Sequence, residues 1–181
     1  MAHKLIWGAT LVLCACFTTS QSMPNGMKSK TEPSATETAA VSAAFEKVKA
    51  LAGEWEALYD GKMMKDTFRV VSDGSAVLHT ESWNGSTQGA VSVIYPNGNE
   101  LWLDHYCDLE NQPRFSARPQ PNSDVIVFEL RGITNLRSPD AEYFHRGTFH
   151  FIDHDHHIQD WQWFKDGKQK EILRLDFKRI K

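Results

Sequence analysis

The chain has 181 residues and a formal net charge of −3, from 20 basic and 23 acidic side chains. The basic residues form no block, so nucleic acid is not expected as a partner. Once an N-terminal signal and a linker are set aside, about 140 residues remain, which is the size of one domain with its own hydrophobic core.

The first fifteen residues have the pattern of a secretory signal. A short basic start is followed by an apolar run from Leu5 to Ala15. This run is much shorter than the roughly 20 residues that cross a bilayer as a helix. It ends in Leu13-Cys14-Ala15-Cys16, which resembles the lipobox of bacterial lipoproteins. The resemblance implies cleavage of residues 1–15 and acylation of Cys16.

We therefore expect an exported protein that is anchored to a membrane through Cys16 and faces the periplasm. Phe17 follows in place of an Asp, which implies sorting to the outer membrane. An ordinary signal that is cut after Ser20 or Ser22 is the alternative. Cleavage before Cys16 leaves Cys107 without a partner, so the core alone must stabilise the fold. Such a cysteine is usually a small buried hydrophobic residue, although a reactive thiol is also possible.

Residues 16–39 are rich in Ser, Thr, Pro, Lys and Glu and show no apolar period. This composition predicts a flexible tether, and residues 40–181 are then the domain. The domain starts with apolar residues at helical spacing, which predict a helix over Val41–Ala52 that ends at Gly53.

After Gly53 the pattern changes to short strands separated by turns. The Asp-Gly and Asn-Gly dipeptides typical of hairpin turns are Asp60-Gly61, Asp73-Gly74, Asn84-Gly85, Asn97-Gly98 and Asp166-Gly167. Runs rich in β-branched and aromatic residues predict strands at Glu54–Tyr59, Thr67–Val71, Ala76–Trp83, Ala90–Tyr95, Glu100–Cys107, Arg114–Arg118, Val125–Arg131, Thr148–Ile152, Ile158–Phe164 and Glu171–Phe177. No helix is expected between them before the stretch 135–144.

Successive hairpins form an antiparallel meander, and closure into a barrel removes the exposed edges of such a sheet. The sequence therefore predicts an all-β, antiparallel up-and-down barrel of about ten strands with a short N-terminal helix. A sandwich of two sheets is the alternative.

The helix, the segment Gly53-Glu54-Trp55 and the meander that follows together resemble the calycins, the lipocalin-like barrels. In calycins a Gly-x-Trp at the start of the first strand packs across the closed end of the barrel, often beneath a basic residue of the last strand. The resemblance implies that Trp55 is buried beneath the helix, with Arg174 or Arg179 above its ring in a cation–π contact.

Other segments resemble a more specific family of small secreted or lipid-anchored bacterial proteins of lipocalin-like shape and uncharacterised function. They are His105-Tyr106-Cys107, Asn111-Gln112-Pro113-Arg114, Thr134-Asn135-Leu136 and Gln159-Asp160-Trp161-Gln162-Trp163. The resemblance covers residues 45–177 and implies a fold without an activity. The barrel is more distantly similar to nitrobindin-type haem barrels, but no ligand motif of theirs maps onto this chain, and no cofactor is identified.

Alternation along two strands groups the candidate binding residues. The first group contains His105 and Cys107, and the second contains Trp161 and Trp163. We predict that both groups face inward, because Asp104 and Asp160 then lie outside, where a carboxylate stays hydrated.

His105, Cys107, Trp161 and Trp163 are thus predicted to line one cavity for a small hydrophobic or amphipathic molecule. In the alternative, side chains simply fill the barrel. Arg114 and Asn135 are placed at the mouth of the cavity, where Arg114 is suited to binding a carboxylate. Tyr106, Asn111 and Gln112 complete this polar set. In the alternative, the Asn and Gln side chains cap their own backbone.

Histidines and aspartates are densest at His150 and over Asp153–His157. Such a cluster is either a Zn or Cu site or a solvated hairpin turn, and no fixed ligand spacing favours the metal.

The chain has no Gly-x-Ser-x-Gly, Walker or dinucleotide motif, so an enzyme is less expected than a binding protein. Two alternatives to simple binding are kept. One is an enzyme that uses His105 for acid–base chemistry with Tyr106 or His145 nearby, and the other is a haem or metal carrier that uses barrel or turn histidines.

Overall fold

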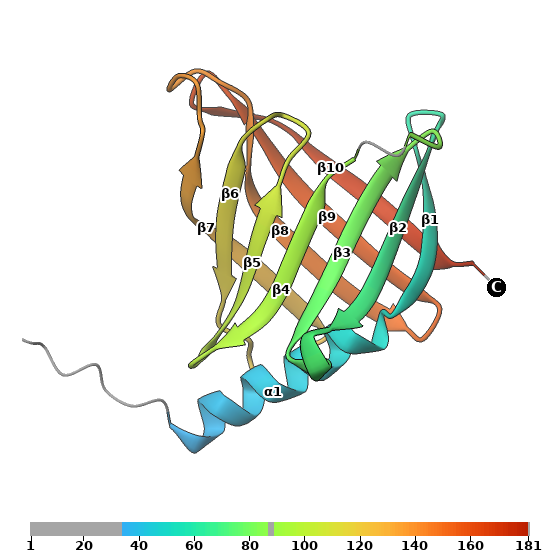
Figure 1. Cartoon of the computed structure of the whole chain (residues 1–181), viewed down its shortest axis with the longest axis vertical. Helices are drawn as coiled ribbons and strands as arrows, with labels where there is room; N and C mark the ends of the chain where they lie inside the picture. The colour runs from blue at the N-terminus through green and yellow to red at the C-terminus, as the bar shows by residue number, and fades with distance from the viewer. Residues whose placement is uncertain (1–33, 87–88, 181) are drawn as a thin grey trace, which may run out of the picture. The chain divides into compact units, whose positions relative to one another are not determined.

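The computed structural model describes residues 34–86 and 89–180, which form a helix and a closed antiparallel barrel (Figure 1). Each strand pairs with the next along the chain, and β10 closes the barrel by pairing with β1. The elements are α1 (Ala35–Ala50), β1 (Gly53–Tyr59), β2 (Lys62–Val71), β3 (Ala76–Trp83), β4 (Val91–Asn97), β5 (Glu100–Tyr106), β6 (Gln112–Ala117), β7 (Val125–Thr134), β8 (Tyr143–Asp153), β9 (His156–Lys165) and β10 (Lys168–Arg179), with a 3-10 turn at Ser72–Gly74. The predicted barrel is confirmed, and the two-sheet sandwich was the wrong alternative.

The helix begins earlier than the sequence predicted. Ser34 caps it by accepting a hydrogen bond from the backbone N–H of Glu37, and the Glu37 carboxylate accepts one from the Ser34 N–H. This capping box starts the helix at Ala35 because it satisfies N–H groups that the first turn leaves free. Residues 35–39, which we assigned to the tether, are therefore helical. The rest of the predicted tether, the signal and Cys16 lie outside the described residues.

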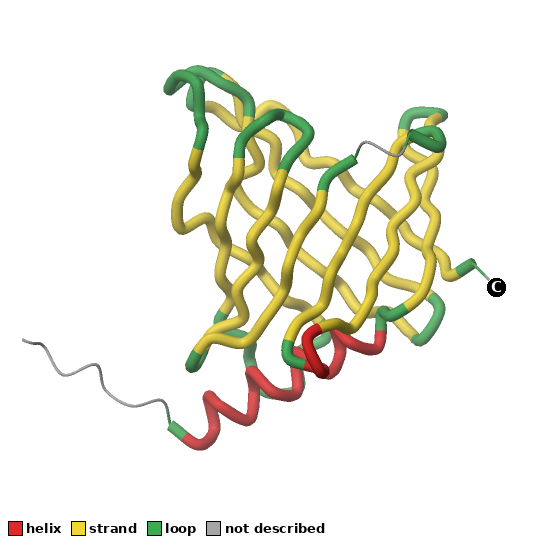
Figure 2. Tube along the Cα trace, viewed as in Figure 1, coloured by secondary structure: helices red, strands yellow, loops and turns green. Residues whose placement is uncertain are grey.

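Helix α1 lies across one end of the barrel (Figure 2). Its buried face, which includes Val41, Phe45 and Val48, belongs to the main hydrophobic core. No helix among the described residues is long and apolar enough to cross a membrane.

Trp55 is fully buried at this end of the barrel. Its indole Nε1 donates a hydrogen bond to the carbonyl of Leu51 at 2.7 Å. The Arg179 guanidinium lies 4.1 Å from the centroid of the Trp55 ring, whereas Arg174 is on the outside, bonded to Asp160. Of the two candidates, Arg179 makes the expected cation–π contact.

The turn dipeptides lie where the chain reverses. Both residues have positive φ in Asp60-Gly61, Asp73-Gly74, Asn84-Gly85 and Asp166-Gly167, whereas in Asn97-Gly98 only the glycine does. The stretch between β7 and β8 contains no helix. Several strands extend beyond their predicted bounds, because ladder pairing continues through polar residues that face solvent.

The predicted inward faces are confirmed. Leu101, Leu103 and His105 of β5 are buried, and so are Gln159 and Trp161 of β9. On the outside, Asp104 pairs with Arg114 and Asp160 pairs with Arg174. The interior also holds buried polar side chains from β2, β3, β4 and β9, which set the character of the site described next.

Candidate functional site

A cavity of about 280 Å³ lies within the barrel. The cavity lies toward the barrel end away from α1. Strand β1 begins beside the helix at Gly53 and ends at Tyr59, and Tyr59 is one of the lining residues. The lining residues are Tyr59, Met64, Glu81, Trp83, Ala90, His105, Asp108, Leu109, Glu142, Phe144, Trp161, Trp163, Glu171, Leu173 and Leu175. Most of them are aromatic or aliphatic. Because the space between them is open, the barrel is not simply filled by its side chains.

Three of the predicted site residues meet in this cavity. His105, Trp161 and Trp163 all line it, and the rings of His105 and Trp161 stack with centroids 5.5 Å apart. Cys107 is buried but is not among the lining residues. Burial raises the pKa of its thiol well above the ordinary value, which favours the hydrophobic interpretation over the reactive one.

Arg114 does not lie at the cavity. It is on the outer face of β6, where its guanidinium makes two hydrogen bonds to the Asp104 carboxylate, of 2.6 and 3.1 Å. Its neighbours on both sides, Pro113 and Phe115, are buried, so alternation turns Arg114 outward. Arg114 therefore does not line this cavity, but it lines an outer hollow that shares His105 with the cavity wall.

Asn135 lies in a separate surface hollow that shares Leu109 and Glu142 with the cavity wall. Its side chain donates to the carbonyl of Glu110 at 2.6 Å, and its φ is +58°. The Asn111 amide likewise donates to the carbonyl of Glu142 at 2.8 Å. Both asparagines thus hold the backbone of a distant segment in place, rather than capping only their own backbone.

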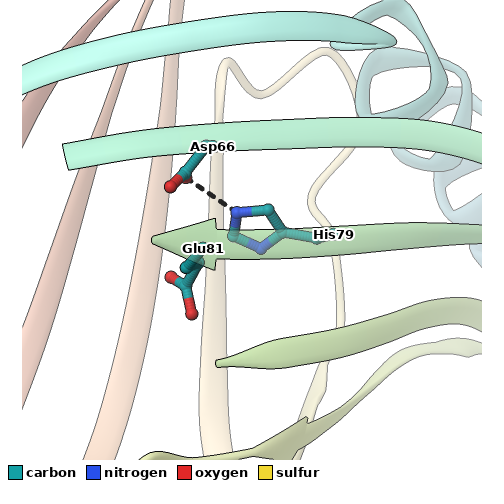
Figure 3. Close-up of side chains that lie close together, drawn as sticks. All are labelled: Asp66, His79 and Glu81. Carbon is teal, nitrogen blue, oxygen red and sulfur yellow. Dashed lines mark hydrogen bonds and ion pairs between the residues drawn. The ribbon is translucent and has the colours of Figure 1, made fainter. Parts of the chain in front are cut away.

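The sequence analysis missed a buried cluster of acidic and histidine side chains on β2 and β3 (Figure 3). Asp66 and His79 are fully buried, and His79 Nε2 lies 2.7 Å from Asp66 Oδ2. Glu81, two residues after His79 on the same strand, lines the cavity. Figure 3 shows Asp66 and Glu81 on opposite sides of the His79 ring.

Hydrogen bonds connect this cluster to the cavity wall. Gln159 Nε2 donates to Asp66 Oδ2 at 2.8 Å, and Gln159 Oε1 accepts from Trp161 Nε1 at 3.0 Å. A second route runs through His105, whose Nδ1 is hydrogen-bonded to Ser92 Oγ at 2.8 Å and lies 3.9 Å from Glu81 Oε2. A molecule in the cavity would therefore touch two side chains that lead to the cluster. Trp161 reaches Asp66 through Gln159, and His105 lies beside Glu81.

The interior shifts the titration of these groups. Burial raises the pKa of Glu81 to about 7, against the opposing effect of His79. Burial also lowers the pKa of His105 to about 3, and the charge of His79 acts in the same direction. For His79 itself burial acts to lower the pKa, but the carboxylates of Asp66 and Glu81 outweigh it and raise the value. The nearby carboxylates thus move the pKa of His79 in the direction opposite to that of His105.

The histidines of the β8–β9 turn do not gather. His154 is exposed at the turn and hydrogen-bonded to Asp155, and His150 pairs with Asp160. His157 points inward and packs against Trp55. Among residues 34–86 and 89–180, the donor atoms of potential metal ligands come together only at Asp66, His79 and Glu81. The solvated-turn interpretation therefore fits this segment.

Part of this cluster had a visible signal. The predicted strand Ala76–Trp83 already put His79 and Glu81 on one face with Val77 and Trp83. Asp66 lay outside the predicted strand Thr67–Val71, so its partnership with them was not visible.

No protein-family model and no curated protein matches the sequence. Among solved structures, the chain is similar to Rv2717c from M. tuberculosis, with a TM-score of 0.53, 17% identity, and coverage of 76% of this chain and 98% of that one. It is also similar to a protein of unknown function from the DUF3598 family of Nostoc punctiforme, with a TM-score of 0.51 and 15% identity. That match covers 74% of this chain but only 49% of the Nostoc protein. At these identities the likeness shows the fold alone, so the expected resemblance to uncharacterised barrel proteins is confirmed for the barrel.

Proposed function

We propose that this protein binds a small amphipathic molecule in its internal cavity. The observation that carries the proposal is a space of about 280 Å³ whose lining is mostly aromatic or aliphatic, with a smaller set of polar groups. In such sites apolar area supplies affinity, and sparse polar groups fix the orientation of the ligand. The volume is near the lower end of ligand pockets, which favours a compact ligand over a long acyl chain.

The charges of the lining favour a neutral or cationic ligand over an anion. Four carboxylates line the cavity, whereas no Lys or Arg of residues 34–86 and 89–180 does; they belong to Glu81, Asp108, Glu142 and Glu171. Two of these carboxylates are already engaged, since Lys165 pairs with Glu142 and the Tyr59 hydroxyl donates to Glu171. Arg114, which suggested a ligand carboxylate, lies on the outer face of the barrel.

The geometry does not favour acid–base catalysis by His105. Its pKa near 3 leaves the ring neutral at physiological pH, so it serves as a hydrogen-bonding group. Tyr106, the expected partner, is 56% exposed and on the opposite face of β5. His145 stacks on Phe164 with centroids 4.4 Å apart, and neither ring belongs to the cavity lining.

A fluorescent probe of suitable size and polarity, N-phenyl-1-naphthylamine, tests the proposal. We expect it to bind the full-length protein with one saturable site, to quench tryptophan fluorescence, and to lose at least about tenfold in affinity in Trp161→Ala, which removes a packed aromatic wall. The matched control is Trp102→Ala, because Trp102 is also a partly covered tryptophan but lies on the outer face of β5.

A second variant guards against indirect effects of the alanine. Ala90 is a small, buried residue of the cavity wall, and Ala90→Leu should reduce probe affinity by filling space. Equal affinity in the wild type, Trp161→Ala and Ala90→Leu would show that the probe binds elsewhere and would overturn the proposal.

We further propose that this binding takes place at a membrane facing the periplasm, with the chain held there by a lipid on Cys16. The support is the Leu13-Cys14-Ala15-Cys16 segment after a short apolar run.

A further inference from the structure

Two carboxylates face each other inside the barrel. Asp66 of β2 and Glu81 of β3 are directly opposite in the strand register, and the side chains of both point to the interior. Like charges in directly opposite positions are destabilising, and burial increases the cost because water no longer screens them. A pair of this kind indicates that something positive belongs between or beside the two groups.

No lysine or arginine lies against these carboxylates in the part of the chain that the structure describes. Among the described residues, neither Asp66 nor Glu81 forms an ion pair with a lysine or an arginine. The nearest nitrogen atoms belong to histidines: His79 Nε2 lies 2.7 Å from Asp66 Oδ2, and His105 Nδ1 lies 3.9 Å from Glu81 Oε2. The interior therefore presents two carboxylates and two imidazoles at one level of the barrel.

Buried atoms of this cluster also lack partners. Among the described residues, Asp66 Oδ1 and His79 Nδ1 have no hydrogen-bond partner. Water cannot replace the missing partner from outside, because both side chains are fully inaccessible. A buried polar atom without a partner costs about 1–3 kcal/mol, so native proteins rarely leave such atoms on two bonded side chains. A carboxylate oxygen and an imidazole nitrogen are both metal-ligand atoms.

We propose that Asp66, His79 and Glu81 bind one divalent transition-metal ion inside the barrel. Each residue offers one donor atom, and the three atoms lie within 4.8 Å of one another. Donors bonded to a single ion at about 2.0–2.2 Å lie roughly 3–4 Å apart, so small side-chain shifts close the site. Two carboxylates balance the charge of the ion, and the imidazole favours Zn, Fe, Co or Ni over Mg or Ca.

The neighbouring side chains hold the ligands in place. The ring of Phe68 stacks on His79 with centroids 4.1 Å apart and planes 5° apart, which fixes the orientation of the imidazole. Gln159 donates to Asp66 Oδ2 and is itself bonded to Trp161. Such outer hydrogen bonds orient ligands and tune affinity in metal sites.

The cavity provides the route to the site. Glu81 lines it, while Asp66 and His79 are buried behind. Three protein ligands leave coordination positions for water or for a group of a bound molecule. The ion site can be told apart from the proposed amphipathic ligand site, because Asp66 and His79 do not line the cavity and Glu81 alone belongs to both.

The test uses the full-length protein, freed of metal with a chelator and titrated with Zn²⁺ by calorimetry and with Co²⁺ by visible absorption. We expect one equivalent of each ion to bind, with d–d bands for Co²⁺. Glu81→Gln keeps the shape of the side chain and removes its charge, and it should weaken binding by at least about tenfold, the loss that even outer-shell changes cause. Asp66→Asn should do the same.

Two control variants locate the ion. Glu142→Gln removes a carboxylate from the same cavity but outside the cluster, and His154→Ala removes the exposed histidine of the β8–β9 turn. Both should bind Co²⁺ as the wild type does. Absence of binding in the wild type, or loss in His154→Ala with retention in Glu81→Gln, would overturn the proposal.

Thermal unfolding gives an independent readout. Zn²⁺ should raise the Tm of the wild type and of Glu142→Gln, but not that of Glu81→Gln, because an ion stabilises only the fold that binds it. An equal rise in all three would contradict the assignment. Naphthylamine binding, measured on the same proteins, separates a failure of the ion site from a failure of the cavity proposal.

Discussion

Gly147 of β8 lies directly opposite Trp161 of β9 and leaves no room for a side chain there. A Cβ on Gly147 would be 2.7 Å from the nearest carbon of the Trp161 ring, with two further ring carbons at 3.0 and 3.1 Å. The absence of a side chain at position 147 thus lets the Trp161 ring lie flat enough to form a wall of the cavity and to reach Gln159.

We expect Gly147→Ala to displace the Trp161 ring. The methyl group overpacks the wall, and such changes usually cost about 1–3 kcal/mol, so both the free energy of unfolding in urea and the affinity for the naphthylamine should fall. Gly132 of β7 is a matched control, because a Cβ there would meet nothing within 4 Å. Equal effects in Gly147→Ala and Gly132→Ala would show that the contact with Trp161 is unimportant.

Trp55 is expected to be the most costly single tryptophan to remove. It is fully buried, bonded to Leu51 and covered by Arg179, so Trp55→Ala should lower the free energy of unfolding by about 3–5 kcal/mol. Chemical denaturation followed by circular dichroism measures this. Trp102→Ala, on the outer face, should cost clearly less, and a loss as large as that of Trp55→Ala would argue against a special role for the covered barrel end.

The fold was predictable because its signals are local. Dipeptides such as Asp60-Gly61 and Asn84-Gly85 tolerate positive φ and mark the hairpins, and a chain of hairpins has few ways to hide its edges. The facing of β5 and β9 followed from the cost of burying Asp104 or Asp160. That argument brought His105, Trp161 and Trp163 to one cavity.

The buried cluster was not predictable in the same way. Asp66 and Glu81 are neighbours only through the register of β2 and β3, and alternation along one strand does not specify register. The cost of burial argued correctly against an inward Asp104, and the same argument would have placed Asp66 outside. Arg114 was predicted to begin a strand and also to lie at the cavity mouth, but in β6 it stands between the buried Pro113 and Phe115, so its side chain points outward.

The proposed anchor predicts the chemistry of the N-terminus. In a Gram-negative host we expect the mature protein to start at Cys16, to carry acyl chains on that residue and to partition into detergent. Mass spectrometry of the membrane fraction measures this. Cys16→Ser should abolish acylation, while Cys14→Ser should keep it, because the position two residues before the modified cysteine is variable in the lipobox. An unmodified N-terminus beyond Cys16 would exclude the anchor.

His157 predicts a specific loss of stability in acid. Burial, followed by the charges of His79, His156 and Arg179, lowers the pKa of His157 to about 3. In the unfolded chain the pKa of the ring is near 6.5. Between about pH 6.5 and 3 the imidazole is therefore protonated in the unfolded state and neutral in the folded state. Stability from this group is therefore complete above pH 6.5 and falls as the pH drops through that window.

Replacing His157 with Phe isolates this effect. The ring already stacks on Phe177, with centroids 5.0 Å apart, and meets Trp55 edge-on at 4.4 Å, so a phenyl ring suits the site. Between pH 7.5 and 5.0 the wild type should lose about 2 kcal/mol more of its unfolding free energy than His157→Phe does. At pH 5.0 the imidazole is protonated only in the unfolded state, about 1.5 pH units below its pKa there, and each pH unit contributes about 1.4 kcal/mol. Other buried groups, including His105 with its lowered pKa and Glu81 with its raised one, are present in both proteins and cancel in the comparison.

Urea unfolding at the two pH values measures the difference, and between pH 7.5 and 8.5 the two proteins should change in parallel because the imidazole is neutral in both states. Identical acid sensitivity in the two proteins would mean that His157 takes up its proton in the folded barrel as readily as in the unfolded chain.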